Sequence, residues 1–127
     1  MDSTTQIRWT VFVTALMLVW SAARVLALNS AASGYWTNTA TWAGGVLPVS
    51  NDTIVILNTH TVTVDVSTVP LTSLTINNGG TLVFSGWNTV VTSTTVNVNG
   101  SITHNQNSAT NSPWTPDNRI YLVCSNL

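Results

Sequence analysis

The chain has 127 residues, of which 6% are charged and 44% are hydrophobic. It contains no Lys and no Glu, whereas an ordinary globular domain is about one quarter charged. The length suits one folded unit, and the shortage of cations excludes a surface that neutralises phosphates, so we expect no nucleic-acid partner. The apolar fraction excludes charge-rich disorder, and a single cysteine, Cys124, excludes a disulfide framework.

Residues 1–27 have the pattern of a secretory signal peptide. A short polar start ends at Arg8, and residues 9–23 then run without a charge, which is short for a membrane span. Small residues indicate cleavage near Ala27, or as late as Ala32. We predict a hydrophobic signal helix that is removed, which makes the protein secreted or exposed on the cell surface. The alternative is a membrane anchor that is retained through residues 9–23.

From Asp52 onward, apolar residues alternate with polar ones at a period of two. This alternation, in runs rich in Val, Ile and Thr, is typical of half-buried strands, and Asn/Gly turn signals separate the runs. The sequence therefore predicts an all-β mature protein. The residues predicted to face inward are Ile54, Ile56, Val62, Val64, Val66, Leu74, Ile76, Leu82, Phe84, Val96, Val98, Ile102, Ile120, Leu122 and Cys124.

An internal repeat indicates how the strands are arranged. Residues 71–84 can be laid over residues 91–104, so that Ser73 falls on Ser93, Ile76 on Val96 and Gly80 on Gly100, a step of 20 residues. A further copy begins at residues 123–127, with Ser125 in the place of Ser73. Short strands at such a period favour stacked solenoid coils, and a β-sandwich is the alternative.

The expected layout is a Trp-rich cap and turn region at residues 28–52, followed by coils at residues 53–127 with a polar loop inserted at 104–118. The last coil carries no charge in residues 120–127, so its edge lacks the residues that block strand pairing. We therefore expect a truncated piece of a longer protein, or a subunit whose open edge is covered by another chain. Self-association through this edge would give a dimer or a filament.

A family resemblance follows from the spacing W-x5-W-A-G-G-V-L-P, then D-T-I-V-I, T-V-T-V-D and L-T-S-L-T-I-x2-G-G-T-L-V-F. This pattern resembles the start of secreted right-handed parallel β-helix proteins and is similar to the eight-glycine extracellular domain. The matching positions are Trp42, Gly44, Gly45, Pro48, Asp52, Val62, Val64, Asp65, Leu74, Ile76, Gly80, Leu82 and Phe84. The resemblance implies an N-terminal cap with the first coils, and an extracellular role in carbohydrate contact, adhesion or surface architecture. It places no catalytic residue on this chain.

Few side chains suggest chemistry. Asp52 and Asp65 are weak candidates for a calcium site, because calcium prefers six to eight oxygen ligands, and the alternative is that each caps a turn or a strand end. His60 and His104 are a weak ligand set, and the alternative places each at a coil corner with a ring nitrogen bonded to backbone. Cys124 is expected to be a buried small hydrophobe. We expect no cofactor, no catalytic residue and no metal site.

Tryptophan gives the clearest binding signal. Exposed indole rings stack on sugar faces, so Trp87 and Trp114, which lie beside turn residues, are the candidate carbohydrate contacts. Trp36 and Trp42 are expected to plug the open end of the first coil, and Gly44, Gly45, Pro48, Asp52 and Gly80 are expected to be structural. We therefore predict a non-catalytic structural or adhesive β-solenoid module whose partners are glycans or other surface proteins. The alternatives are a carbohydrate-binding or carbohydrate-processing module and a self-assembling filament subunit.

Overall fold

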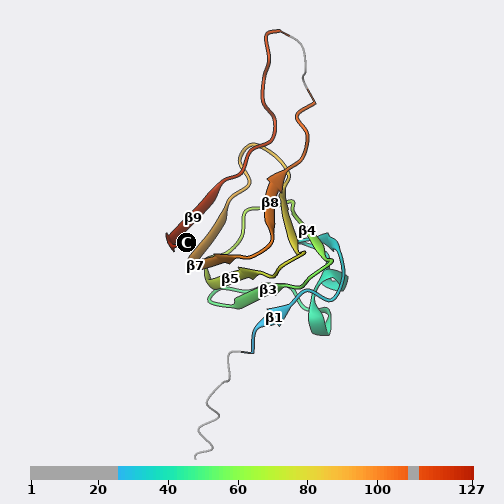
Figure 1. Ribbon diagram of the computed structural model, residues 1–127, viewed down its shortest axis with the longest axis vertical. Coiled ribbons are helices and arrows are strands. Elements are labelled where there is room, and N and C mark those ends of the chain that lie inside the picture. The colour runs from blue at the N-terminus through green and yellow to red at the C-terminus, as the bar shows by residue number, and fades with distance from the viewer. Residues whose placement is uncertain (1–25, 109–111) are drawn as a thin grey trace, which may run out of the picture.

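The computed structural model describes residues 26–108 and 112–127 (Figure 1). Regular structure in these ranges is β-strand, apart from two short 3-10 turns, η1 (Thr39–Thr41) and η2 (Ala43–Gly45). No helix within the same ranges is long and apolar enough to cross a membrane. The predicted signal helix at 9–23 lies outside the described residues.

The strands form two parallel sheets. The five-stranded sheet has the order β1 (Leu28–Asn29), β3 (Thr53–Ile56), β5 (Leu71–Ile76), β7 (Val91–Val98) and β9 (Leu122–Asn126). The four-stranded sheet has the order β2 (Gly34–Tyr35), β4 (Thr61–Val64), β6 (Thr81–Phe84) and β8 (Ser101–His104). Every ladder between these strands is parallel, and successive coils stack on one another. The chain is thus a β-solenoid, as predicted, and the β-sandwich alternative is wrong.

The core is a set of columns that run along the stack. Parallel register places Val62 against Leu82 and Leu82 against Ile102, so like residues cover like. Burying these β-branched and aliphatic side chains removes apolar surface from water, which is the main favourable term in folding. The buried hydrophobic residues are Trp36, Trp42, Ile54, Ile56, Val62, Val64, Leu71, Leu74, Ile76, Leu82, Phe84, Val91 and Val96.

Two tryptophans close the core beside the first coil. Trp36 and Trp42 retain 4% and 1% of their exposure, and their rings meet edge to face with centroids 4.8 Å apart. The indole Nε1 of Trp42 donates a hydrogen bond to the carbonyl of Trp36 at 2.9 Å, so the one polar atom of this buried ring is satisfied. The cap therefore belongs to the hydrophobic core.

The observed repeat differs from the predicted one in the pairing of β5 with β7, the first strand of each repeated segment. The step of 20 residues holds between β6 and β8, where Leu82 pairs with Ile102. Between β5 and β7 the predicted pairing is wrong, because Ile76 pairs with Val98 instead of Val96. The turns explain the shift. Four residues, 77–80, join β5 to β6, whereas residues 99 and 100 alone join β7 to β8. The shorter turn compensates for the two additional residues, Val91 and Thr92, with which β7 begins before the position that pairs with Leu71.

The last coil is displaced by one residue from the predicted position. Cys124, not Ser125, pairs with Ser93, and Leu122 pairs with Val91. A shift of one residue exchanges the two faces of a strand. The observed register packs Leu122 and Cys124 against the core and leaves Ser125 exposed. This arrangement is favourable because the less polar side chains face the apolar interior and the hydroxyl group faces water.

Three residues predicted to face the core are exposed. Val66 is 44% exposed because β4 ends at Val64 and the alternation ends with it. Ile120 is 46% exposed and precedes β9. Val98 pairs with the buried Ile76, yet it is 38% exposed because β9 ends level with Thr95 and does not cover it.

Candidate functional site

The described parts of the loop between β8 and β9, residues 105–108 and 112–121, project away from the coils (Figure 1). Its neck is held by side chains that bond to backbone. The Oδ1 atom of Asn107 accepts from the backbone N–H groups of Asp117 at 2.9 Å and Asn118 at 2.6 Å. The backbone N–H and the hydroxyl of Ser108 both donate to the carboxylate of Asp117. These bonds join the two sides of the loop at its base.

The hydrogen bonds at the neck change the acidity of Asp117. Donation by the Ser108 hydroxyl and then by the Ser108 backbone N–H holds the pKa of Asp117 below its ordinary value of 3.8. Such bonds form to the charged carboxylate and so favour it over the neutral acid. The side chain is exposed to solvent, and its carboxylate accepts hydrogen bonds from Ser108 and Asn118.

A cluster of two aromatic rings and one cation lies at the base of the loop. The guanidinium carbon of Arg119 lies 4.6 Å from the ring centroid of Trp87 and 4.5 Å from that of Tyr121. The Nε atom of Arg119 also donates to the carbonyl oxygen of Trp87 at 2.5 Å. Both rings remain partly open to solvent, with 40% of Trp87 and 42% of Tyr121 exposed. We call these three residues the aromatic-cation cluster.

The β7–β9 register explains why the cluster forms. Val91 pairs with Leu122, so the residues that precede each strand also lie next to one another. The backbone N–H of Val91 donates to the carbonyl of Tyr121 at 3.0 Å, and that of Gly86 donates to Asn118 Oδ1 at 2.7 Å. These bonds fix the chain on both sides of Arg119.

The two predicted carbohydrate contacts occupy different parts of the surface. Trp87 belongs to the aromatic-cation cluster at the base of the loop. Trp114 is 59% exposed and lies farther out on the loop, beyond the neck formed by Asn107 and Asp117. The structure gives Trp114 no part in the cluster.

The two calcium candidates each bond to a different segment. The carboxylate of Asp52 accepts from the backbone N–H of Val49 at 2.8 Å, which closes the turn before β3. Asp65 accepts from the backbone N–H and the hydroxyl of Thr37, which ties the end of β4 to the cap region. In the described part of the chain, no group of three or more His, Cys, Asp or Glu side chains is placed to hold a metal ion.

The histidines also have local partners. Nδ1 of His60 lies 2.8 Å from the hydroxyl of the buried Ser30, and that hydroxyl oxygen accepts from the backbone N–H of Leu57. The partner of His60 is thus a side chain instead of the expected backbone group. Nδ1 of His104 lies 2.7 Å from the carbonyl of Asn105, and the side chain is exposed.

The predicted structural residues lie in turns. Gly44 and Gly45 have φ values of 76° and 66°, a backbone region that favours glycine, and Pro48 after them is buried. Gly80 has a different reason to be glycine. A Cβ atom there would lie 2.9 Å from the carbonyl oxygen of Leu57 and 3.0 Å from that of Asn77, so a larger residue would force the coils apart.

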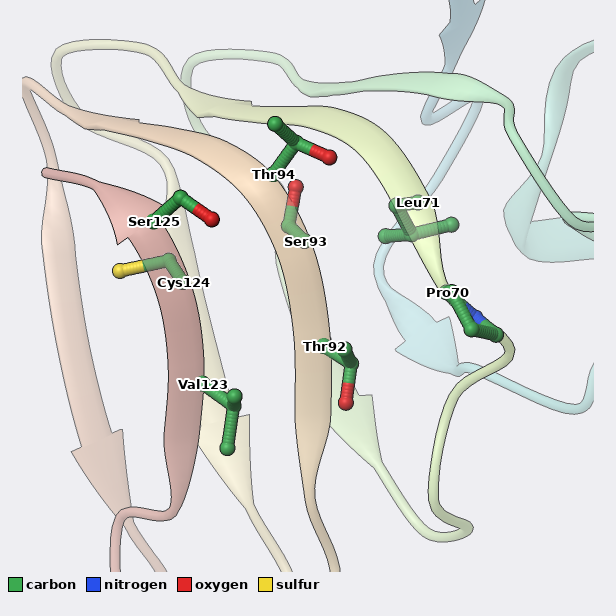
Figure 2. Close-up of a pocket in the computed structure, with 8 residues that line it drawn as sticks. All are labelled: Pro70, Leu71, Thr92, Ser93, Thr94, Val123, Cys124 and Ser125. Atoms are coloured by element: carbon green, nitrogen blue, oxygen red, sulfur yellow. The ribbon is translucent and has the colours of Figure 1, made fainter.

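A shallow depression of about 200 Å³ lies where β5, β7 and β9 curve side by side (Figure 2). Its lining is a mixture of hydroxyl and aliphatic groups, and Cys124 is its one titratable side chain. Cys124 is a free thiol that is half-buried rather than fully buried as predicted. The lining residues are Pro70, Leu71, Thr92, Ser93, Thr94, Val123, Cys124 and Ser125.

Sequence reasoning missed Arg119 and Tyr121 as site residues. They lie more than thirty positions after Trp87, and the predicted register between the last two coils was wrong by one residue. A usable signal was the composition itself, because the chain contains only three basic residues and one of them stands directly beside the last predicted strand.

These observations define a parallel β-solenoid domain with a tryptophan cap and an inserted loop. A model of the G8 domain family matches residues 41–120, which is more than half of the chain, and the chain belongs to this family. The resemblance to the eight-glycine domain is thereby confirmed, and G8 domains are an extracellular family. Neither a search of curated proteins nor a search of solved structures returned a match.

Proposed function

We propose that this G8 domain is an extracellular structural and adhesive module: a β-solenoid whose capped end starts the stack and whose other end pairs with a further strand. The observation that supports this is the difference between the two ends. Trp36 and Trp42 are buried beside the first coil. At the other end, Ile102 and Leu122 are only half-buried, whereas their paired neighbours Leu82 and Val91 are fully buried.

The edge of β9 favours a partner strand for physical reasons. A terminal strand presents unpaired N–H and C=O groups, and natural edges are protected by lysine, proline or inward-pointing charges. The described strand β9 has none of these. Val123 within it and Tyr121 directly before it are 44% and 42% exposed and uncharged. A second copy of this chain therefore supplies an acceptable partner, either as a dimer or as a filament subunit.

Self-association tests this proposal. Residues 28–127 at high micromolar concentration should sediment as dimers or larger species. The double variant Tyr121→Lys and Val123→Lys should shift the distribution towards monomer, because two charges on the edge oppose pairing. The matched control is Thr61→Lys and Thr63→Lys on β4, which has a neighbouring strand on each side. A monodisperse monomer for the unmodified segment would contradict the proposal.

The absence of catalysis is part of the proposal, and the hydrogen bonds of the ionisable groups support it. The three described carboxylates accept hydrogen bonds from Val49, Thr37 and Ser108, respectively. Both histidines have local partners as well. Groups that already serve turns and strand ends are poorly placed to act as general acids or bases, which need to reach a substrate.

Export through residues 1–27 completes the proposal. The extracellular family and the uncharged run at residues 9–23 support cleavage near Ala27 or Ala32. The mass of the protein recovered outside expressing cells measures the cleavage position directly. A full-length mass in the membrane fraction would instead show that the segment is retained as an anchor.

Carbohydrate binding is the second candidate function. The observation that favours it is the partly exposed Trp87 ring, which is held in place by Arg119 rather than buried in the core. A fixed aromatic face suits the apolar face of a sugar ring, and the neighbouring Tyr121 adds a second ring. Calorimetric titration with neutral and charged polysaccharides tests this candidate independently of self-association.

A further inference from the structure

We infer that the aromatic-cation cluster binds an acidic polysaccharide, with Arg119 recognising a carboxylate or sulfate group and the rings of Trp87 and Tyr121 contacting the sugars. The inference rests on the second candidate function and names its ligand class. It starts from the position of Arg119, whose guanidinium carbon lies within 4.6 Å of both ring centroids.

The guanidinium group is oriented before any ligand arrives. Two aromatic contacts and the Nε hydrogen bond to the Trp87 carbonyl restrict a side chain that otherwise loses much rotamer freedom on binding. Arginine presents its donors in a planar fork, and this fork matches the two oxygens of a carboxylate or the oxygens of a sulfate. Nε is engaged, so the terminal nitrogens are the donors that remain for an anion.

The carboxylates that the structure describes have other hydrogen-bond donors. Asp52 accepts from Val49, Asp65 from Thr37, and Asp117 from Ser108 and Asn118. Arg119 is half-buried and is the one basic residue in the described ranges. A partly desolvated cation of this kind gains most from a charge-assisted hydrogen bond.

The charge of the whole chain makes the inference specific. The formal net charge is −1 at pH 7, so the protein as a whole does not attract a polyanion. Any binding of an acidic polymer should therefore come from a local site. In the described part of the chain, the aromatic-cation cluster is the site with both a cation and sugar-stacking rings. Binding should weaken as salt is added, because the contact is electrostatic and partly exposed.

The test is calorimetric titration of residues 28–127 at pH 7 with polygalacturonate, dextran sulfate and neutral dextran. We expect binding to at least one acidic polymer and weaker or no binding to dextran. Arg119→Gln should weaken binding about tenfold or more, since it removes charged hydrogen bonds. Arg119→Lys should also weaken it, because lysine keeps the charge and loses the fork.

The aromatic contribution has a matched control. Tyr121→Ala should weaken binding, whereas Tyr35→Ala, which removes a still more exposed tyrosine (58% against 42%) from β2 in the other sheet, should leave it unchanged. Urea unfolding of each variant separates binding from stability. If Arg119 only fastens the loop, its variants lower the urea midpoint and the unmodified protein binds no acidic polymer.

The outcomes distinguish a failure of this inference from a failure of carbohydrate binding, the candidate function on which it rests. Binding to neutral dextran with equal or no binding to the acidic polymers would overturn the inference and leave carbohydrate binding standing. No binding to any polymer would overturn both. Equal binding of an acidic polymer by the unmodified protein and Arg119→Gln would also overturn the inference. The polygalacturonate and dextran sulfate arms distinguish carboxylate from sulfate as the recognised group.

Discussion

Val64 and Val66 show how strongly position decides the role of a residue in this fold. They are the same residue type, two positions apart, and the period of two assigns both to the core. Val64 is fully buried on β4, and Val66 is 44% exposed just after the strand ends. The alternation identifies a buried face correctly, yet it carries no information on where the strand ends.

The two valines therefore give a matched prediction. Val64→Asp should lower the free energy of unfolding by several kcal/mol, because it buries a charge without a partner. Val66→Asp should change it by less than about 0.5 kcal/mol, as is usual for exposed sites. Urea midpoints of the two variants measure the difference. Equal destabilisation would show that residue 66 faces the core and that the boundary of β4 is misplaced.

At the scale of elements, strands and turns were predictable to different degrees. The buried faces of β3, β4 and β6 follow from alternating sequence, since each strand has a neighbour above and below that covers its inward side chains. The pairing of β5 with β7 was not predictable from the repeat, because two turns of unequal length join these strands to the next sheet. The length of these turns sets the register between β5 and β7. Aligning Ser73 with Ser93 in the sequence gave a different register, because Ser73 pairs with Thr95.

The candidate site depends on the same pairing. Trp87 was predicted as a surface contact from its neighbouring turn residues, and it is exposed. Arg119 and Tyr121 join it only because β9 lies next to β7. Contacts between residues so far apart in the chain depend on the register of the last coil. The sequence repeat does not determine this register, because the loop inserted before the last coil interrupts the repeat.

The neck of the β8–β9 loop should depend on pH. The fold holds the pKa of Asp117 below 3.8, so it favours the ionised carboxylate. The resulting stabilisation is complete above that ordinary value and is lost as the pH falls through the lower pKa of the folded state. The exchange rate of the Ser108 amide, which donates to Asp117, should therefore rise below about pH 3.8 relative to core amides.

Asp117→Asn provides the control for the neck. Asparagine keeps one oxygen acceptor and does not titrate, so the Ser108 amide should exchange at a rate that follows the ordinary pH dependence of a peptide. A pH profile in the unmodified protein that is identical to that of Asp117→Asn would show that the carboxylate does not hold the neck.

For the whole molecule, stability should be graded along the stack. In a solenoid each coil contacts only its neighbours, so stability is a sum of coil and interface contributions. The central strands β3, β5 and β7 have partners on both sides, whereas β9 has a partner on one side. Trp36 and Trp42 protect the capped end, and residues 26–108 and 112–127 place no comparable cap over β8 and β9.

The central proposal is that Trp36 and Trp42 close the described coils at one end and that β9, at the other end, pairs with a further strand. Hydrogen exchange of the β9 amides, measured by NMR at low and high protein concentration, tests it most directly. We predict that the β9 amides pointing away from β7 exchange quickly in dilute solution and become protected as the concentration rises, while amides of β3 and β5 stay protected throughout. Protection of all β9 amides in dilute solution, unchanged by concentration, would contradict the proposal.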